Sequence, residues 1–191
     1  IKYFIQFFFI IILLFIYKIL GLRISNFLSG KIFSFLGPFF RSKKIIHSNI
    51  KRVFPNINPK SLKKITDSMW ENYGRVFAEY MFIKDFRSDQ LSNNITIEGK
   101  EILDEIREKN LKAIFISGHF SNFELMAMHL EKAGINLSAI YRPLNNIFLN
   151  KIMERIRKKY ICKYQIKKGI GGMKKLINLM NNNSSTALMI D

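Results

Sequence analysis

Cysteine and histidine are rare in this chain of 191 residues, which has one Cys and three His. A single cysteine, Cys162, excludes a disulfide framework, which is typical of a chain in a reducing compartment. No His or Cys residues have metal-ligand spacing, so we expect no metal site. The glycine-rich segment "GIGGM" (169–173) lacks the G-x-G-x-x-G order and follows no clear strand. We therefore expect no dinucleotide site and no cofactor.

Acidic residues are absent from the first third of the chain. No Asp or Glu precedes Asp67, whereas the same 66 residues hold twelve Lys or Arg. The formal net charge of the whole chain is +17. A surplus of this size favours an anionic partner, which the charge alone leaves open between nucleic acid, an anionic membrane and an acidic protein.

Residues 3–22 form a long apolar run that only Gln6 and Lys18 interrupt. About 20 residues at a rise of 1.5 Å span roughly 30 Å, the thickness of a hydrocarbon core. We therefore predict a transmembrane anchor over residues 1–22, with a buried core helix and a cleaved signal peptide as the alternatives.

The next segment, residues 23–40, mixes Phe and Leu with Arg and Lys, and Gly37-Pro38 interrupts it. This pattern predicts a short amphipathic helix in the headgroup layer. The acid-free basic region after the anchor then places residues 41–191 in the cytoplasm by the positive-inside rule.

The remaining segment, residues 41–191, is predicted as one α/β domain with a mostly parallel sheet flanked by helices, because strand and helix patterns alternate. A helical segment over 41–84 precedes the sheet. The expected strands are 95–97, 112–117 (a compact buried strand), 136–141, 164–166 and 186–190. The expected helices are 100–109, 122–134, 144–160 and 171–182.

The stretch "GHFSNFEL" (118–125) places His119 five positions before Glu124, directly after a predicted strand. Five residues turn an ideal helix by about 500°, so the two side chains meet only if His119 lies in the turn before the helix. We expect Gly118 to give this turn its freedom. A neutral imidazole can then accept a proton from a hydroxyl while the carboxylate orients it. The alternative is a purely structural turn, and we expect His47 and His129 to be surface or packing residues.

Several blocks occur in an order that resembles the bacterial lipid A biosynthesis acyltransferases. "HSNIKRVFP" and "WENYGRVFAEY" come first, and "ISGHFSNFEL" is similar to the family's "GHFGNWE" block with its H-x4-D/E motif. "YRPLNN" and "GMKKLINLM…ALMID" are similar to the second and third blocks. Ser121 and Phe123 differ from the Gly and Trp that the family usually has. The chain begins with Ile and ends within the third block, so we expect a fragment whose acyltransferase domain is incomplete at its C-terminus.

The resemblance implies transfer of a fatty acyl group from acyl carrier protein to a hydroxyl of a lipid A precursor at the bacterial inner membrane. His119 would be the general base and Glu124 its orienting partner. The residues implied in substrate binding are Arg142, Asn145, Asn146 and Asp191. Acyl carrier protein is acidic and lipid A precursors carry phosphates, which suits the basic run 151–168, although this run also fits a solvated helix face. We expect the membrane lipids to be partners and expect no nucleic acid.

Two other functions stay open at this point. A related acyltransferase on another glycolipid or glycerolipid acceptor would use the same H-x4-D/E motif. A non-enzymatic, membrane-anchored basic protein that binds nucleic acid or lipid headgroups would explain the charge and the anchor but gives His119 and Glu124 no role.

Overall fold

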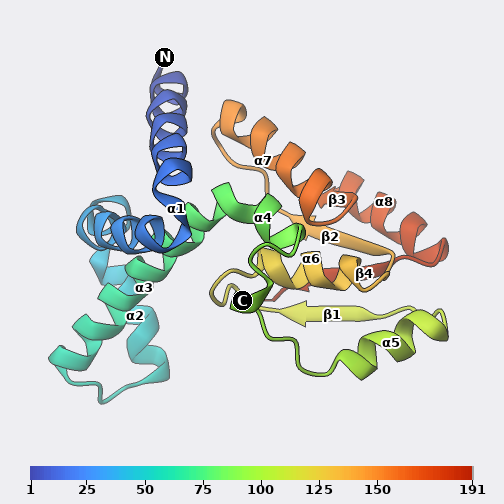
Figure 1. Ribbon diagram of the computed structural model, residues 1–191. Coiled ribbons are helices and arrows are strands. Elements are labelled where there is room, and N and C mark those ends of the chain that lie inside the picture. Colours follow the sequence, from blue (N-terminus) through green and yellow to red (C-terminus); the bar gives the residue numbers. More distant parts are fainter. Residues whose placement is uncertain (191) are drawn as a thin grey trace. The chain divides into compact units, whose positions relative to one another are not determined.

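A computed structural model describes residues 1–190: every secondary-structure element before residue 114 is a helix, and strands alternate with helices from there on (Figure 1). Residue contacts divide the chain into two compact units. The helical unit comprises Ile12–Phe82, and the sheet unit comprises Ile1–Ile11 together with the chain from Ile83 onward.

The helical unit contains most of α1 (Lys2–Phe40), followed by α2 (Lys43–Val53), α3 (Pro59–Glu79) and the 3-10 turn η1 (Tyr80–Phe82). The start of α3 follows from its sequence: the side chain of Asn58 accepts a hydrogen bond from the Ser61 amide at 2.8 Å. Pro59 stands at the first helical position, where no amide hydrogen is needed. The predicted helical segment 41–84 is therefore confirmed as two helices and a turn.

The helix α1 changes direction at Gly21, whose φ of 76° lies in the left-handed region. Only glycine adopts this φ without a steric cost. The expected break at Gly37-Pro38 is wrong, because the helix continues through both residues to Phe40. Gly37 serves close packing instead: a Cβ there would lie 2.2 Å from the ring of Trp70.

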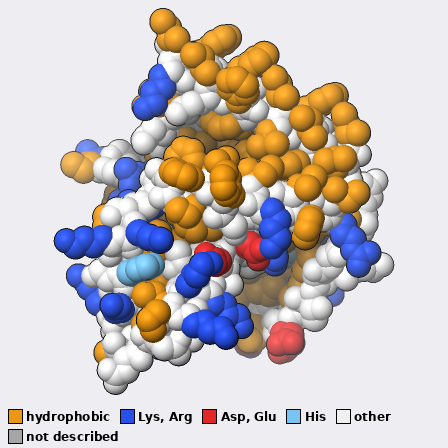
Figure 2. Space-filling view, turned by 90° about the vertical axis from the view of Figure 1, so that its left-hand side faces the viewer, with side chains coloured by type: hydrophobic (Ala, Val, Ile, Leu, Met, Phe, Trp, Pro, Cys, Tyr) orange, Lys and Arg blue, Asp and Glu red, His pale blue; other side chains and the backbone are white. Residues whose placement is uncertain are grey.

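Most large apolar side chains of α1 are exposed, and Figure 2 shows hydrophobic side chains gathered over the upper part of one face. The helix is long and apolar enough to cross a membrane by length and composition, a test that a signal sequence also passes. Such a surface is unfavourable in water and favourable in a hydrocarbon environment. Membrane association of this chain therefore rests on α1.

The sheet unit is built on four parallel strands in the order β1-β4-β2-β3. The strands are β1 (Ile114–Ser117), β2 (Leu137–Tyr141), β3 (Tyr164–Lys167) and β4 (Ser185–Met189). The other elements are α4 (Ile83–Arg87), η2 (Ser92–Asn94), α5 (Lys100–Glu108), α6 (Glu124–Lys132), α7 (Ile147–Tyr160) and α8 (Ile170–Asn181). The predicted α/β class with a parallel sheet is confirmed.

Helices pack on the inner strand β2 and on the outer strand β3 of this sheet. The helix α6 contacts β2, and both α7 and α8 contact β3. Met128 from α6, Leu137 from β2 and Ile166 from β3 are almost fully buried in this core. This packing therefore holds the carboxyl ends of β2 and β3 in a defined position.

Two expectations about strands are wrong. Residues 95–97 are irregular rather than a strand. The strand at 114–117 is not buried: Ile114 and Ile116 are 58% and 60% exposed. Over residues 1–190, β1 pairs only with β4, so its other edge has no neighbouring strand. The apolar run therefore predicts the strand correctly, but the prediction that this strand is buried is wrong.

Candidate active site

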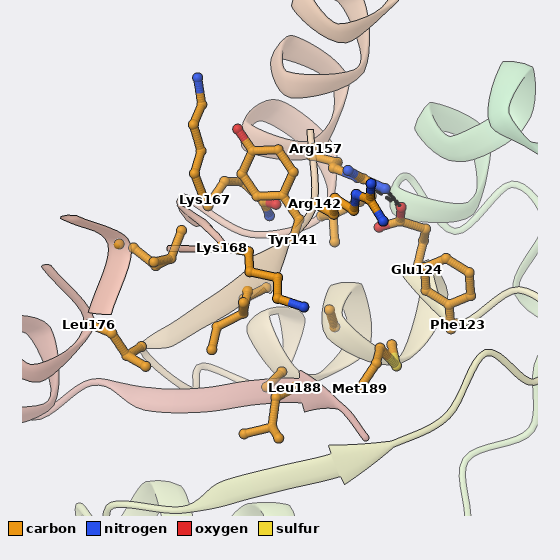
Figure 3. Close-up of a pocket in the computed structure, with 18 of the residues that line it drawn as sticks. Phe123, Glu124, Tyr141, Arg142, Arg157, Lys167, Lys168, Leu176, Leu188 and Met189 are labelled. Carbon is orange, nitrogen blue, oxygen red and sulfur yellow. Dashed lines mark hydrogen bonds and ion pairs between the residues drawn. The ribbon is translucent and has the colours of Figure 1, made fainter. Parts of the chain in front are cut away.

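A pocket of about 620 Å³ lies where the four strands end. Tyr141, Lys167 and Met189, the last residues of β2, β3 and β4, line it (Figure 3). His119, two residues after the end of β1, also lines it. The carboxyl ends of parallel strands are the usual place for a site in an open α/β sheet. Its ionisable lining residues are His119, Glu124, Arg142, Arg157, Lys167 and Lys168.

The turn between β1 and α6 brings both motif residues to this pocket. The strand ends at Ser117 and the helix begins at Glu124, so His119 lies in the turn and Glu124 in the first helical turn, as predicted. His119 is exposed, and its ring meets the Phe123 ring edge to face, with centroids 4.8 Å apart. The two residues therefore line one pocket from one strand–helix junction.

The residue of this turn with a left-handed backbone conformation is Ser121, not Gly118. Ser121 has a φ of 44°, whereas Gly118 is not among the glycines with positive φ. A left-handed conformation costs a non-glycine residue roughly 1–2 kcal/mol. The expectation for Gly118 was therefore wrong. Ser121 is the strained residue, and it stands where the acyltransferases that the sequence resembles usually have glycine.

Glu124 is held by Arg157 of α7 in a buried ion pair. The Arg157 Nε and Nη2 atoms both donate to Glu124 Oε1, at 2.8 Å and 2.5 Å. The two side chains are only 13% and 7% exposed, respectively. Hydrogen bonds between charged, buried partners are the strong ones, because little solvent screens them. The Glu124 carboxylate therefore has a fixed position in the pocket that His119 also lines.

Arg157 is in turn placed by Tyr141 and Glu154. Its guanidinium lies over the Tyr141 ring, 5.5 Å from the centroid. The Tyr141 hydroxyl donates to Glu154 at 2.5 Å, and Asn150 donates to the same oxygen at 2.9 Å. These hydrogen bonds, with Lys167 at 3.2 Å, lower the pKa of Glu154 to about 2, while burial raises the pKa of Tyr141. Glu154 therefore stays ionised and Tyr141 stays protonated across the physiological range.

The mouth of the pocket is basic. Arg142 follows β2 directly and is exposed, and its side chain points toward Glu124 in Figure 3. Lys168 follows β3, and its amide donates to the Tyr141 carbonyl at 2.9 Å. Cationic side chains at this edge attract and orient an anionic group.

The pocket also has an apolar wall. It is formed by α8 and by the adjoining strands, with Met173 and Leu176 from the helix and Leu188 from β4. Leu176 is 6% exposed, whereas Met173 is 54% exposed at the rim. The pocket therefore combines an apolar wall with basic groups, as an amphipathic ligand requires.

The other predicted binding residues differ in their surroundings. Asn145 is exposed in the loop before α7. Asn146 caps α7, because its Oδ1 accepts from the amides of Phe148 and Leu149 at 3.1 Å and 3.2 Å. Neither asparagine lines the pocket with Arg142. Asp191 lies outside the described residues.

The remaining histidines lie elsewhere. His47 lines a shallow hollow on α2 with Lys44 and Lys51. His129 lies on α6, where burial chiefly lowers its pKa. Within residues 1–190, no three His, Cys, Asp or Glu side chains are grouped as metal ligands would be.

The basic run 151–168 is divided by the structure into two kinds of residue. Arg157 and Lys167 make ion pairs with Glu124 and Glu154 inside the sheet unit. Lys167 is also exposed, together with Lys151, Arg155, Lys158, Lys159, Lys163 and Lys168. Sequence reasoning missed Arg157 as a site residue, although it follows the half-buried Met153 by four positions and so shares its helix face.

The fold and the pocket define an α/β protein with a His–Glu turn at the carboxyl edge of a parallel sheet. The profile described as "Bacterial lipid A biosynthesis acyltransferase" matches residues 1–191. The chain therefore belongs to this family, and membership supports an acyltransferase.

One curated relative agrees with this assignment. The chain is 21% identical over 131 residues to the "Lipid A biosynthesis myristoyltransferase" of Escherichia coli (strain K12). The alignment covers 69% of this chain and 40% of the relative, so the chain spans less than half of the length of the protein that it matches.

Proposed function

We propose that this protein transfers a fatty acyl group from the thioester of acyl carrier protein to a hydroxyl of a lipid A precursor, at the cytoplasmic side of the inner membrane. The observation that carries the proposal is the pocket at the strand ends, in which His119 and the Arg157-bound Glu124 lie beside cationic and apolar walls. The family and the curated relative support the acyl-transfer class.

In the proposed reaction, His119 accepts the proton of the acceptor hydroxyl. The hydroxyl oxygen then forms an ester bond with the thioester carbonyl carbon, the carbon–sulfur bond breaks, and the thiol leaves with a proton returned by the imidazolium. Glu124 orients the imidazole and stabilises its positive form, which is the usual role of a carboxylate behind a catalytic histidine. General-base help of this kind contributes about 10²–10⁴-fold.

The remaining groups of the pocket suit the two substrates. Arg142 and Lys168 are placed to bind a phosphate of the acceptor or the oxyanion that forms at the thioester carbonyl. Met173, Leu176 and Leu188 offer a wall for the acyl chain. The exposed cations of the 151–168 run are placed to attract an acidic donor protein through long-range charge.

The test is acyl transfer by purified full-length protein supplied with acyl carrier protein thioesters and a panel of acceptors: a lipid A precursor, a glycerolipid and a second glycolipid. Products are identified by mass. An added acyl group on the lipid A precursor supports the proposal. Acylation of the glycerolipid alone would keep the chemistry and reject the acceptor, whereas no product from any pair would reject both.

Glu124→Gln provides a second test of the residue roles. This variant keeps the shape of the side chain but cannot compensate an imidazolium, so kcat should fall sharply. The effects of Glu124→Gln and His119→Ala should not add, because the two residues act as one unit. Additive losses would contradict the proposed pairing.

A further inference from the structure

The loop 142–146, between β2 and α7, carries Arg142, the exposed cation at the mouth of the pocket. The fold fixes both ends of this loop. Tyr141 is the last residue of β2, and its carbonyl accepts a hydrogen bond from the Lys168 amide at 2.9 Å. At the other end, Asn146 is 6% exposed, caps α7 and donates to the Tyr3 carbonyl at 2.8 Å. The position of the Arg142 cation therefore depends on what holds the middle of the loop.

A side chain of α7 holds the middle of the loop. The Leu144 amide donates to Asn150 Oδ1 at 2.9 Å. Among residues 1–190, the amides of Arg142 and Asn145 have no hydrogen-bond acceptor in the protein. Pro143 fixes its own φ and favours an extended backbone at the preceding residue, but it leaves its ψ free. Because this ψ sets the direction of the Leu144 amide, the contact with Asn150 removes the freedom that the proline leaves.

The same side chain is also connected to the residue before Arg142. Asn150 Nδ2 donates to Glu154 Oε1 at 2.9 Å, and this oxygen also accepts the Tyr141 hydroxyl at 2.5 Å. Arg142 therefore lies in the chain between two residues that contact Asn150: Leu144 directly, and Tyr141 through Glu154. One asparagine thus fixes the backbone on both sides of the cation.

The two contacts of Asn150 require an amide. A backbone N–H can only donate, so the atom that faces Leu144 must accept. Glu154 is ionised, because the hydrogen bond from Tyr141 chiefly lowers its pKa to about 2. An ionised carboxylate can only accept, so the atom that faces Glu154 must donate. An asparagine side chain provides both atoms, whereas an aspartate would place a second carboxylate beside Glu154.

We propose that Asn150 is a positioning residue that holds Arg142 at the mouth of the pocket to bind a phosphate of the lipid acceptor. Asn150 does not line the pocket, so it acts on the substrate only through the loop. The inference rests on the proposed function, because it takes the acceptor to be a phosphorylated lipid. It assigns Arg142 to the bound acceptor rather than to the oxyanion. Loss of a contact with the bound acceptor raises KM, whereas loss of a contact made only in the transition state lowers kcat.

The experiment compares Asn150→Ala, Arg142→Ala and the double variant in full-length protein, with the phosphorylated acceptor that the parent protein acylates. Asn150→Ala should raise KM for the acceptor by about 3–10-fold and leave kcat nearly unchanged, which is the size expected for one lost hydrogen bond. In the Arg142→Ala background the same change should have little further effect, because the cation that Asn150 positions is gone. Asn178→Ala, at an exposed position of α8 that does not line the pocket, is the matched control and should change neither constant.

Asn150→Asp gives a pH signature that a general loss of stability does not produce. The new carboxyl lies beside Glu154, so one of the two has a raised pKa and the pair shares a proton at low pH. The other ionisable groups at this oxygen are Lys167, at 3.2 Å, and the Tyr141 hydroxyl. The shared proton replaces the amide donor, so KM should be close to that of the parent at about pH 5.5 and should exceed it increasingly toward about pH 8.

An unchanged KM in folded Asn150→Ala, or additive effects of Asn150→Ala and Arg142→Ala, would overturn the proposal. A lower kcat at unchanged KM would also overturn it and assign Arg142 to the oxyanion. If the parent acylates no acceptor, the proposed function fails instead, and amide hydrogen exchange decides the inference. The Leu144 amide should then exchange several-fold faster in Asn150→Ala than in the parent, and equal exchange would show that Asn150 does not hold the loop. Circular dichroism establishes that each variant is folded.

Discussion

The two compact units use their polar side chains in different ways. In the helical unit, Ser25 and Ser29 are fully buried and donate to the carbonyls of Tyr17 and Gly74 at 2.7 Å and 2.6 Å. The sheet unit also buries neutral polar pairs such as Ser138 and Ser184, but at its pocket the polar contacts join charged side chains, with Glu124 and Arg157 as the central pair.

This difference separates a packing role from a chemical one. Small residues with internal hydrogen bonds allow helices to approach closely, as they do where helices pack in membranes. Charges fixed in a poorly solvated place act strongly on any group bound beside them. The comparison therefore locates the proposed chemistry in the sheet unit and structural support in the helical unit.

The largest expected effect separates histidines of the two units. His119→Ala removes the proposed base from the pocket, so kcat for acyl transfer should fall by about 10²–10⁴-fold. His47→Ala, in the helical unit, should leave turnover close to that of the parent protein. Steady-state kinetics of both variants in the same reconstituted membranes provides the measurement. Near-normal turnover by folded His119→Ala would show that the His–Glu turn is only structural.

The next effect concerns the buried ion pair. Arg157→Met leaves the Glu124 carboxylate buried without its cation, which typically destabilises a protein by about 3–5 kcal/mol. Lys158→Met, at the neighbouring exposed position, should change stability little. Thermal unfolding followed by circular dichroism compares the two variants.

A positioning role for Arg157 has a second signature. Without this cation, the Glu124 carboxylate loses the contact that fixes its position, so kcat of Arg157→Met should fall while KM changes little. The double variant Arg157→Met, Glu124→Gln should recover part of the lost stability because no unpaired charge stays buried. An unchanged kcat in folded Arg157→Met would limit Arg157 to a structural role.

A smaller effect compares glycines in the two units. A Cβ at Gly74 would lie 2.3 Å from the Ser29 carbonyl oxygen, so Gly74→Ala should force α1 and α3 apart at a cost of about 1–3 kcal/mol. A Cβ at Gly171 of α8 would meet nothing within 4 Å, so Gly171→Ala should stabilise by up to about 1 kcal/mol. Limited proteolysis and thermal unfolding measure both, and equal effects of the same sign would refute the comparison.

The smallest effect tests the strained turn. Ser121→Gly relieves the left-handed φ of 44° but also frees the unfolded chain, so the net gain should be below about 1 kcal/mol. Ser117→Gly in β1 gains no such relief and should destabilise by about 0.5–1 kcal/mol. Denaturant unfolding of the pair checks the sign, and a loss of stability in Ser121→Gly would contradict the strain.

Much of the fold was predictable because its signals are local. The predicted helices at 100–109, 144–160 and 171–182 are confirmed within a few residues by α5, α7 and α8. Each has an apolar periodicity complete within its own window. The break at Gly21 was not predicted, because the residues on both sides of it favour a helix. A left-handed φ leaves no mark in the sequence except the glycine itself.

The candidate site was predictable only in part. His119 and Glu124 are neighbours in sequence, so a short motif was enough to find them. Arg157 lies 33 residues after Glu124 in a run of basic residues, and its charge there predicted a partner-binding surface. The helical periodicity of α7 could have placed Arg157 on its half-buried face. Periodicity does not show which carboxylate lies against that face.

The sequence by itself determined the apolar first helix, the alternation of strands and helices, and the His–Glu turn, because each is set by residues within one element or one turn. The tertiary structure alone decided that Arg157 holds Glu124 and that Asn146 joins α7 to the first turn of α1, across 33 and 143 residues respectively. The physical reason is that a buried charge or amide takes as its partner whichever group the packed backbone brings within hydrogen-bond distance, and distance along the chain does not fix which group that is.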